Sequence, residues 1–490
     1  MAKRTAVIDI GSNSARMVVY ERTSRYGFYL LNETRSRVRI SEGAYEKDGS
    51  LQPVAMQRAL RALSQFLTIA KSYKARKILC VATSAVRDAP NRKEFVKLVE
   101  SELGLKIKVI NGNKEAYLGG IAAANLLPIE DAVTIDIGGG STDLALIEKK
   151  RVKSLFSLNI GTVRLKELFF DKKMPIEDVE EYIEEALKAL PPEFRQKVAV
   201  GIGGTIRALS KAILQRNHHT IEKIHAFRYD LEDERKFLKK VAYAPVMKLS
   251  KYGIKKDRLD TIRPGALIFL KVLEKISAKE VITSGAGVRE GIFLSDLLRN
   301  SNGLFPANFN PSVRSLQDRF CTDRRLSSNI SSTACAIFDA LKRAFNLPEN
   351  LKKHLNIAAK LSQIGVRLDF YAYHKHSAYM IMNSLDYGFS HEDMILIATL
   401  IRFHKRRLPK ESFTKHYKTL LPDEKTLFWL SYIVSLAQTI HMSRAYGKVS
   451  ASYSDNVLTI ETPFDTYLAE ERIKELEKPA PIAVKLSQKS

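Results

Sequence analysis

Apolar runs that end in glycine turns recur along the first 300 residues of the chain. Residues 5–10 form one such run, which stops at Gly11, and residues 132–137 form another, which stops at Gly138. Short apolar runs bounded by glycine turns are typical of buried strands. The same pattern predicts further strands at residues 16–21, 26–32, 77–82, 107–110, 144–148, 152–158, 198–202 and 281–283.

Apolar residues at helical spacing lie between these strands. They predict helices at 55–73, 95–103, around Glu115, at 162–170 and 176–190, then a long helical stretch to about 280 and one more helix after Gly287. Strands that alternate with helices indicate an α/β fold.

The chain contains an internal repeat. Ile8 to Ser14 reads Ile-Asp-Ile-Gly-Ser-Asn-Ser, and Ile135 to Ser141 reads Ile-Asp-Ile-Gly-Gly-Gly-Ser. The copies lie 127 residues apart (135 minus 8), which is about one domain length. We therefore expect a duplicated α/β unit with two glycine loops that face one cleft.

The pattern changes after about residue 300. A polar, proline-marked linker follows, and residues 313–445 are almost wholly helical in pattern. A short strand at 457–461 and a charged helix at 466–477 come next, and we expect the tail at 479–490 to be loose. We assign one α/β domain to residues 1–125, a second to 126–305 and a helical domain to 312–490. The helix near 288–300 is a candidate to pack back on the first domain.

The charge balance points to a polyanionic partner. The chain has 79 lysines and arginines against 54 aspartates and glutamates, a formal net charge of +25. Such an excess favours nucleic acid, an anionic membrane or polyphosphate as a partner, and a merely solvated basic surface is the alternative.

Three cysteines without metal or disulfide spacing fit a reducing cytoplasm. Cys80 lies in an apolar run and is expected in a core. We expect no membrane span, because the most apolar segment, Leu427 to Met442, is interrupted by polar residues and reads as a buried helix.

The two glycine loops offer phosphate chemistry. Their backbone N–H groups and hydroxyls can surround phosphate oxygens. Asp9 and Asp136 each stand near the end of a strand, a usual position for a carboxylate that holds Mg²⁺. Because the two loops match and carry equivalent aspartates, we do not expect them to be ordinary turns that resemble each other by chance.

Seven stretches, taken in order, resemble the exopolyphosphatase / guanosine pentaphosphate phosphatase (Ppx/GppA) family of the actin–hexokinase superfold. They are Asp9–Ser14, Ala82–Asn91, Lys114–Ala116, Asp136–Asp143, Ser157–Arg164, Gly201–Thr205 and Gly287–Gly291. The resemblance implies two duplicated ribonuclease H-like domains around a cleft, followed by a helical domain similar to HD phosphohydrolases.

The resemblance also implies roles for single residues. Glu115 matches the family's general base and Arg87 its terminal-phosphate arginine, whereas Asp9, Asp136 and Asp143 are expected on the Mg²⁺ side. The family usually has Glu where Asp143 stands, so ligation there can become water-mediated. The remaining expected phosphate contacts are Gly11, Ser12, Asn13, Ser14, Arg16, Gly138, Gly139, Gly140, Ser141, Arg164, Gly203, Gly204 and Thr205.

The helical part departs from the HD pattern. Where the His-Asp pair would lie the chain has Leu361–Gly365, and Gln438 replaces a later Asp. Amides and hydroxyls are poor substitutes for such ligands. We expect a metal-free, non-catalytic domain, whose basic stretch around Arg402 and Lys405 is either a polyanion contact or a solvated face.

These features together predict a Mg²⁺-dependent phosphoanhydride hydrolase. Its expected substrates are inorganic polyphosphate and guanosine pentaphosphate, without preference between them, and no nucleic acid or membrane partner is expected. By resemblance, a homodimer through the helical part is plausible. A sugar or acetate kinase and a non-catalytic regulator that binds alarmone or polyphosphate are the competing hypotheses.

Overall fold

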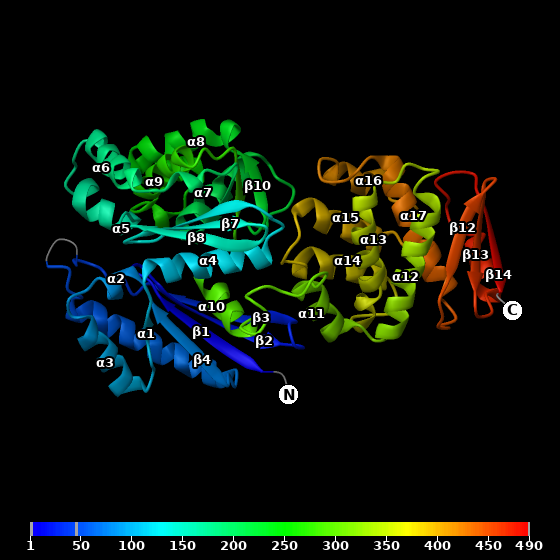
Figure 1. The fold of residues 1–490 in the computed structure, drawn as a ribbon, viewed down its shortest axis with the longest axis horizontal. Coiled ribbons are helices and arrows are strands. Elements are labelled where there is room, and N and C mark those ends of the chain that lie inside the picture. Colours follow the sequence, from blue (N-terminus) through cyan, green and yellow to red (C-terminus); the bar gives the residue numbers. More distant parts are fainter. Residues whose placement is uncertain (1–2, 45–47, 489–490) are drawn as a thin grey trace. The chain divides into compact units, whose positions relative to one another are not determined.

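The computed structural model describes residues 3–44 and 48–488 and divides the chain into two compact units (Figure 1). The first spans Met1–Phe309 and the second Asn310–Ser490. Among the described residues, no helix is long and apolar enough to cross a lipid bilayer.

The first lobe of the first unit contains a five-stranded sheet of order β3-β2-β1-β4-β5. The first three strands form antiparallel hairpins, and β4 and β5 run parallel to β1. The strands are β1 (Arg4–Ile10), β2 (Ala15–Arg22), β3 (Phe28–Ser36), β4 (Lys77–Ala82) and β5 (Lys108–Val109).

The second lobe repeats this arrangement in a six-stranded sheet of order β10-β11-β9-β6-β7-β8. The hairpins β6-β7-β8 correspond to β1-β2-β3, and β9 and β11 run parallel to β6 as β4 and β5 do to β1. The strands are β6 (Ala132–Ile137), β7 (Thr142–Glu148), β8 (Arg151–Leu158), β9 (Val198–Ile202), β10 (Phe227–Asp230) and β11 (Glu280–Thr283). The duplicated α/β fold expected from the repeat is confirmed.

Helices cover both sheets, apolar residues of sheet and helices form a large core in each lobe, and a further buried cluster joins residues 123–127 to the second sheet. The helices of the first unit are α1 (Pro53–Ser72), α2 (Ser84–Arg87), α3 (Arg92–Leu103), α4 (Gly112–Leu126), α5 (Thr162–Leu165), η1 (Lys166–Phe170), α6 (Ile176–Lys188), η2 (Pro192–Phe194), α7 (Gly203–Arg216), α8 (Leu231–Tyr243), η3 (Val246–Tyr252), η4 (Lys256–Arg258), α9 (Ile262–Lys275) and α10 (Val288–Leu297).

Helices α4 and α10 cross between the lobes. Helix α4 follows the first sheet in the chain but packs on β7 and β8 of the second, whereas α10 follows the second sheet and packs on β1 of the first. The ring of Phe293 in α10 lies 4.4 Å from that of Tyr20 in β2. The crossing is close, because a Cβ at Gly291 would lie 2.0 Å from the carbonyl oxygen of Leu118. These two helices therefore fix the base of the cleft between the lobes.

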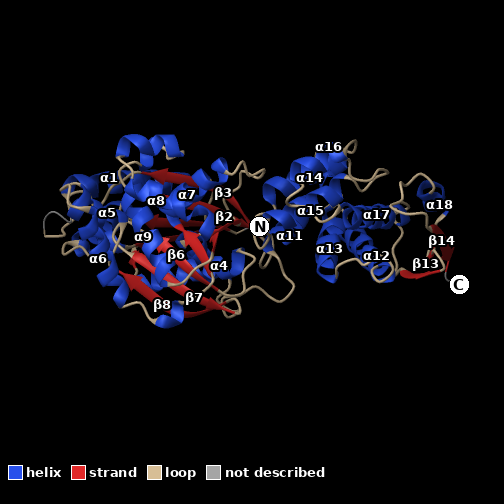
Figure 2. Cartoon of the chain, turned by 90° about the horizontal axis from the view of Figure 1, so that it is seen from above, coloured by secondary structure: helices blue, strands red, loops and turns tan. Residues whose placement is uncertain are grey.

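The second unit is mainly helical and ends in a small sheet, drawn in red in Figure 2. Strand β13 pairs antiparallel with β12 and parallel with β14. The elements are α11 (Pro311–Phe320), α12 (Arg324–Leu341), η5 (Glu349–Leu351), α13 (Lys352–Leu361), η6 (Ile364–Arg367), α14 (Tyr373–Ser384), α15 (His391–Arg402), α16 (Glu411–Thr414), η7 (Lys415–Tyr417), α17 (Glu424–Ile440), β12 (Ser450–Ser454), β13 (Val457–Thr462), α18 (Tyr467–Ile473) and β14 (Ala483–Gln488).

Two expectations about these elements are wrong. The stretch expected to be helical up to about 280 contains strand β10, whose Phe227 and Tyr229 are buried while Arg228 and Asp230 are exposed. The tail expected to be loose contains strand β14, which completes the C-terminal sheet. Both strands are short and add to the edge of an existing sheet, so their local sequence carries little signal. The buried helix expected at Leu427–Met442 is confirmed as part of α17.

The close crossing of α4 and α10 leads to a stability prediction. We expect Gly291→Ala to lower the free energy of unfolding of the first unit by about 1–3 kcal/mol, because the new methyl group must displace the backbone of α4. The matched control is Gly119→Ala in α4, where the new Cβ would meet only the end of the Ile202 side chain at 3.3 Å. Chemical denaturation of both variants checks this, and equal stability of the Gly291 variant and the wild type would contradict it.

Candidate active site

The two glycine loops form equivalent turns at the ends of β1 and β6. In the first, the N–H of Gly11 donates to the Ser14 carbonyl at 3.2 Å, and in the second the N–H of Gly138 donates to the Ser141 carbonyl at 2.9 Å. Residues 11–14, Gly138 and Gly139 line one cavity of about 150 Å³, here called the inner cavity. The loops of the two lobes therefore face each other, as the repeat predicted.

Three predicted acids line the inner cavity. Asp9 and Asp136 occupy the same position in their strands, one residue before the strand ends, and Glu115 lies in the first turn of α4. The side chain of Asn111 accepts a hydrogen bond from the N–H of Lys114 at 2.8 Å and so begins this helix. The N-terminal end of the α4 dipole favours a negative charge at Glu115.

Burial dominates the protonation of these acids. It raises the pKa of Asp136 to about 7, and the neighbouring Asp143 adds to the effect. The pKa of Asp9 is also raised by burial, although Arg289 and Arg16 oppose the shift. Burial, followed by repulsion from Asp143 and Asp136, raises the pKa of Glu115 well above its ordinary value. Asp136 is therefore poised to hold a proton near neutral pH, and burial likewise makes Asp9 and Glu115 harder to ionise than exposed acids.

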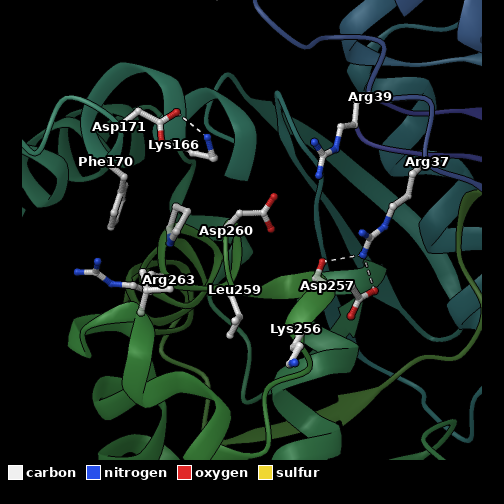
Figure 3. Close-up of a pocket in the computed structure, with 12 residues that line it drawn as sticks. Arg37, Arg39, Lys166, Phe170, Asp171, Lys256, Asp257, Leu259, Asp260 and Arg263 are labelled. Atoms are coloured by element: carbon white, nitrogen blue, oxygen red, sulfur yellow. Dashed lines mark hydrogen bonds and ion pairs between the residues drawn. The ribbon is translucent and has the colours of Figure 1, made fainter.

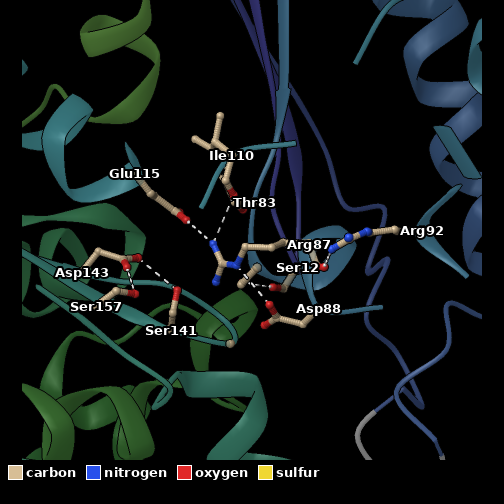
Figure 4. A network of polar contacts seen from close by, with 12 residues as sticks. Ser12, Thr83, Arg87, Asp88, Arg92, Ile110, Glu115, Ser141, Asp143 and Ser157 are labelled. Atoms are coloured by element: carbon tan, nitrogen blue, oxygen red, sulfur yellow. Dashed lines mark hydrogen bonds and ion pairs between the residues drawn. The ribbon is translucent and has the colours of Figure 1, made fainter. Parts of the chain in front are cut away.

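Asp143 lies beside the cavity and is held by two serines (Figure 4). Ser141 Oγ donates to Asp143 Oδ2 at 3.0 Å, and Ser157 Oγ donates to Oδ1 at 2.5 Å. Burial raises the pKa of Asp143 to about 6, although both hydrogen bonds favour the carboxylate. The Asp143 carboxylate is thus anchored to the second loop by Ser141 and to strand β8 by Ser157.

Arg87 links this acid cluster to the first lobe. Its guanidinium lies 3.4 Å from Glu115 Oε2 and 3.0 Å from Asp88 Oδ1. Arg164 lies 3.7 Å from the other oxygen of Asp88 and donates to the Gly140 carbonyl at 3.1 Å. Figure 4 shows Arg87 pointing toward Glu115. Arg87 and Arg164 therefore meet at Asp88, and Arg164 also contacts the second loop, but both arginines, Gly140, Ser141 and Asp143 lie outside the set of residues that lines the inner cavity.

The turn Gly203–Thr205 lines the same cavity from the second lobe. Gly203 has a φ of +88°, and a Cβ there would lie 2.5 Å from Asp136 Oδ1. A Cβ at Gly204 would lie 2.6 Å from the guanidinium of Arg258. Glycine is needed at 203 because of its positive φ and the adjacent acid, whereas a side chain at 204 would have to displace the guanidinium of Arg258.

The sequence interpretation missed four arginines that line the cavity with Arg16. Arg207 in α7 donates to the Gly203 and Gly285 carbonyls at 2.9 and 2.8 Å, and Arg289 in α10 donates to Glu33 at 2.6 Å. The other two are Arg35 and Arg258. Arg289 stands inside one of the seven matching stretches, so its signal was available, whereas a single arginine outside such a stretch carries none.

Oxygen donors suited to Mg²⁺ are present, but they do not enclose it. Within residues 3–44 and 48–488, no three His, Cys, Asp or Glu side chains converge on a complete metal site. Asp9 Oδ1 is buried and has no hydrogen-bond partner. Mg²⁺ commonly uses one or two carboxylates and takes its other ligands from water and phosphate. Asp9 and Asp136 fit this mode of binding.

In the second unit, neutral side chains meet where the HD ligands would lie. Gln438 donates hydrogen bonds to Ser362 and accepts one from Gln363 at 2.9 Å. His404 is buried, and desolvation lowers its pKa to about 3. Its ring contacts the Ile401 carbonyl and the Tyr373 hydroxyl. These polar groups satisfy one another within the helical core.

Matching hairpins that present glycine loops to one cavity define a two-lobed, duplicated α/β fold of the actin–hexokinase type. The chain belongs to the Ppx/GppA phosphatase family, whose profile matches residues 18–300, and the profile for domain III of these phosphatases matches residues 310–477.

Relatives support the same assignment. A guanosine-5′-triphosphate,3′-diphosphate pyrophosphatase of Pseudoalteromonas translucida (strain TAC 125) is 27% identical over 426 residues, covering 83% of this chain and 82% of the relative. The crystal structure of the Aquifex aeolicus family member is 27% identical with a TM-score of 0.53, covering 61% of this chain and 99% of that one. An exopolyphosphatase from Cytophaga hutchinsonii is 25% identical with a TM-score of 0.55, covering 60% and 98%.

The raised pKa of Asp136 leads to a prediction about stability and pH. Its pKa is about 7 in the folded protein against an ordinary 3.8, so between about pH 4 and pH 7 the folded protein keeps a proton that the unfolded chain releases. Asp136 should therefore contribute a fall in the free energy of unfolding as the pH rises across this window, by a few kcal/mol at most, because one pKa unit corresponds to about 1.4 kcal/mol.

Denaturation in EDTA at pH 5, 6, 7 and 8 measures this fall, and Asp136→Asn should make it smaller. Asp131→Asn is the matched control, because Asp131 is exposed. An identical pH dependence in the wild type and Asp136→Asn would contradict the prediction.

Proposed function

We propose that the protein is a Mg²⁺-dependent phosphoanhydride hydrolase. It removes the terminal phosphate of inorganic polyphosphate or the 5′-terminal phosphate of guanosine pentaphosphate. The observation that carries the proposal is the position of the Glu115 carboxylate, which is 12% exposed, lies 3.4 Å from Arg87 and lines the cavity where the two glycine loops face each other. The named activities of the pyrophosphatase and exopolyphosphatase relatives support both substrates.

Glu115 acts as the general base in this proposal. Its carboxylate takes a proton from a water molecule as the water oxygen attacks the terminal phosphorus. The bond from that phosphorus to the bridging oxygen breaks, so orthophosphate leaves and the shortened chain keeps the bridging oxygen. A raised pKa makes the Glu115 carboxylate a stronger base toward water, and burial is the main cause of that raised pKa.

The two loops and the arginines hold the reacting phosphate. Backbone N–H groups of Ser12–Ser14 and Gly139–Ser141 offer hydrogen bonds to phosphate oxygens without a charge of their own, whereas those of Gly11 and Gly138 close the two turns. Arg87 and Arg164 offer planar guanidinium groups at the edge nearest Glu115. They stabilise the negative charge that builds on the phosphoryl oxygens as the bond breaks.

Asp9 and Asp136 are the residues that would hold Mg²⁺, with Asp143 beside them. When bound, the ion neutralises phosphate charge and orients the phosphate oxygens. Because Ser141 and Ser157 occupy both carboxylate oxygens of Asp143, we assign it a contact through water rather than direct ligation.

The anchoring of Asp143 also supports a second candidate, a regulator that binds alarmone or polyphosphate without turnover. A shorter acid held by two serines can leave the metal too weakly bound for chemistry. Phosphate release from polyphosphate and from guanosine pentaphosphate with Mg²⁺ separates the two candidates. If no phosphate is released from either substrate, the non-catalytic regulator is the remaining candidate.

Glu115→Gln tests the base directly. The amide cannot accept the proton, so we expect kcat to fall about 10²- to 10⁴-fold while substrate binding persists. Phosphate release gives kcat, and titration calorimetry gives the dissociation constant. Glu102→Gln on the exposed face of α3 is the matched control. Hydrolysis by Glu115→Gln at the wild-type rate would show that Glu115 is not the general base.

Mg²⁺ dependence is tested by removal of the ion. We expect EDTA to bring phosphate release to background and added Mg²⁺ to restore it. Asp9→Asn and Asp136→Asn should each require more Mg²⁺ for half-maximal activity, because each removes one anionic oxygen donor. Full activity in EDTA, or an unchanged Mg²⁺ requirement in both variants, would show that no metal is held there.

A further inference from the structure

A second, larger cavity lies between the two lobes next to the inner cavity (Figure 3). This cavity, here called the outer pocket, has a volume of about 470 Å³. Five cations and three aspartates line it, together with apolar side chains. The cations are Arg37, Arg39, Lys166, Lys256 and Arg263. Both lobes therefore contribute positive charge to the same space.

The first lobe supplies its arginines from one short segment. Val38 and Ile40 are buried in the core, whereas Arg37 and Arg39 are exposed and line the outer pocket. Arg35, two residues earlier, lines the inner cavity. Residues 35, 37 and 39 thus lead from the inner cavity into the outer pocket.

This segment is fixed against the first phosphate loop. The N–H of Arg39 donates to the Asn13 carbonyl at 3.0 Å, and the N–H of Ser41 donates to the Ser12 carbonyl at 3.4 Å. Arg58 in α1 donates to the Val38 carbonyl at 3.0 Å. The distance between the loop and the two outer arginines is therefore set by the backbone.

In the second lobe, the single turn η4 also carries one cation at the inner cavity and another at the outer pocket. Arg258 lines the inner cavity and packs on Gly204, whereas Lys256, two residues earlier, lines the outer pocket. Asp257 lies between them and contacts Arg37 at 2.9 Å and Arg35 at 3.6 Å. Figure 3 shows Arg37 pointing at this aspartate. The two cavities adjoin at Asp257.

The substrates are too large for the inner cavity alone. At about 150 Å³ it is smaller than sites that hold whole drug-sized ligands, which are about 300–1,000 Å³. A polyphosphate chain or guanosine pentaphosphate whose terminal phosphate meets Glu115 must extend beyond it. The basic track from Arg35 and Arg258 to Arg37, Arg39 and Lys256 offers that extension the charge it needs.

We propose that the outer pocket binds the phosphate groups of the substrate that lie beyond the reacting end. The inference rests on the hydrolase function proposed above. The ligand chemistry is the phosphate group, supplied either by the rest of a polyphosphate chain or by the 3′-diphosphate of guanosine pentaphosphate. Guanidinium groups suit such ligands, because they bind phosphate oxygens through two parallel hydrogen bonds. A phosphate on this track competes with Asp257 for Arg35 and Arg37.

The double variant Arg37→Gln with Arg39→Gln tests the proposal. Both side chains are exposed, at 41% and 49%, so the fold should tolerate the change. We expect KM to rise about tenfold for long-chain polyphosphate, for guanosine pentaphosphate or for both, because two charged contacts are lost. KM for tripolyphosphate, which has no phosphates beyond the inner track, and kcat for all three substrates should stay within about twofold of the wild type, since uniform binding changes KM alone.

The matched control is Arg61→Gln with Lys71→Gln, which removes the same charge from the exposed face of α1. Lys256→Gln tests the track from the second lobe and should raise KM for the same substrates. The substrate whose KM rises identifies the source of the bound phosphates. A KM that is unchanged for both large substrates, or that rises equally for tripolyphosphate, overturns the proposal.

Failure of the proposed function gives a different result. Wild-type protein would then release no phosphate from any of the three substrates. Binding of long-chain polyphosphate and guanosine pentaphosphate, measured by calorimetry on wild type, double variant and control, still decides the inference in that case. If the double variant binds at least one of these ligands more weakly than both the wild type and the control, the result supports the outer pocket. If all three proteins bind both ligands equally, the result rejects the proposal.

Discussion

Mutual repulsion among buried carboxyl groups is the constraint on which the cleft depends. Asp9, Asp136, Asp143 and Glu115 come from both lobes of the first unit and lie together, largely removed from water. Charges in such a medium repel one another far more strongly than in water. The surrounding groups reduce the energetic cost of this repulsion in two ways. Arginines line the cavity and supply positive charge, and the serines beside Asp143 donate hydrogen bonds to its carboxylate.

The duplicated hairpins show how one fold produces two different faces. In the first lobe Asp9 pairs across the hairpin with Arg16, and in the second Asp136 pairs at the same register with Asp143. One hairpin therefore carries a charge pair and the other carries two acids. This difference makes the first loop suited to phosphate oxygens and the second to a cation. Glu115 and Arg87 then lie between a loop that favours an anionic ligand and a loop that favours a cation.

The sequence is informative about this site where local patterns carry the information. The repeat predicts the paired loops and their aspartates, because a strand end and a glycine turn are local features. Strands β10 and β14 escape such prediction, since each is only the short edge of a sheet defined by other segments. Arg35, Arg207 and Arg258 escape it for a related reason. Each stands in an unremarkable stretch, and only the closure of the two lobes brings them into one cavity.

The position of the cations gives the overall charge a more specific meaning. A net charge of +25 is compatible with many anionic partners, and most exposed lysines contribute only a diffuse field. The arginines at 35, 37 and 39 are different, because backbone hydrogen bonds tie their segment to the first phosphate loop. Their spacing from the reacting end of a substrate is consequently fixed by the fold. A diffuse field attracts every polyanion alike, whereas a fixed row of guanidinium groups discriminates by where the phosphates of a substrate fall.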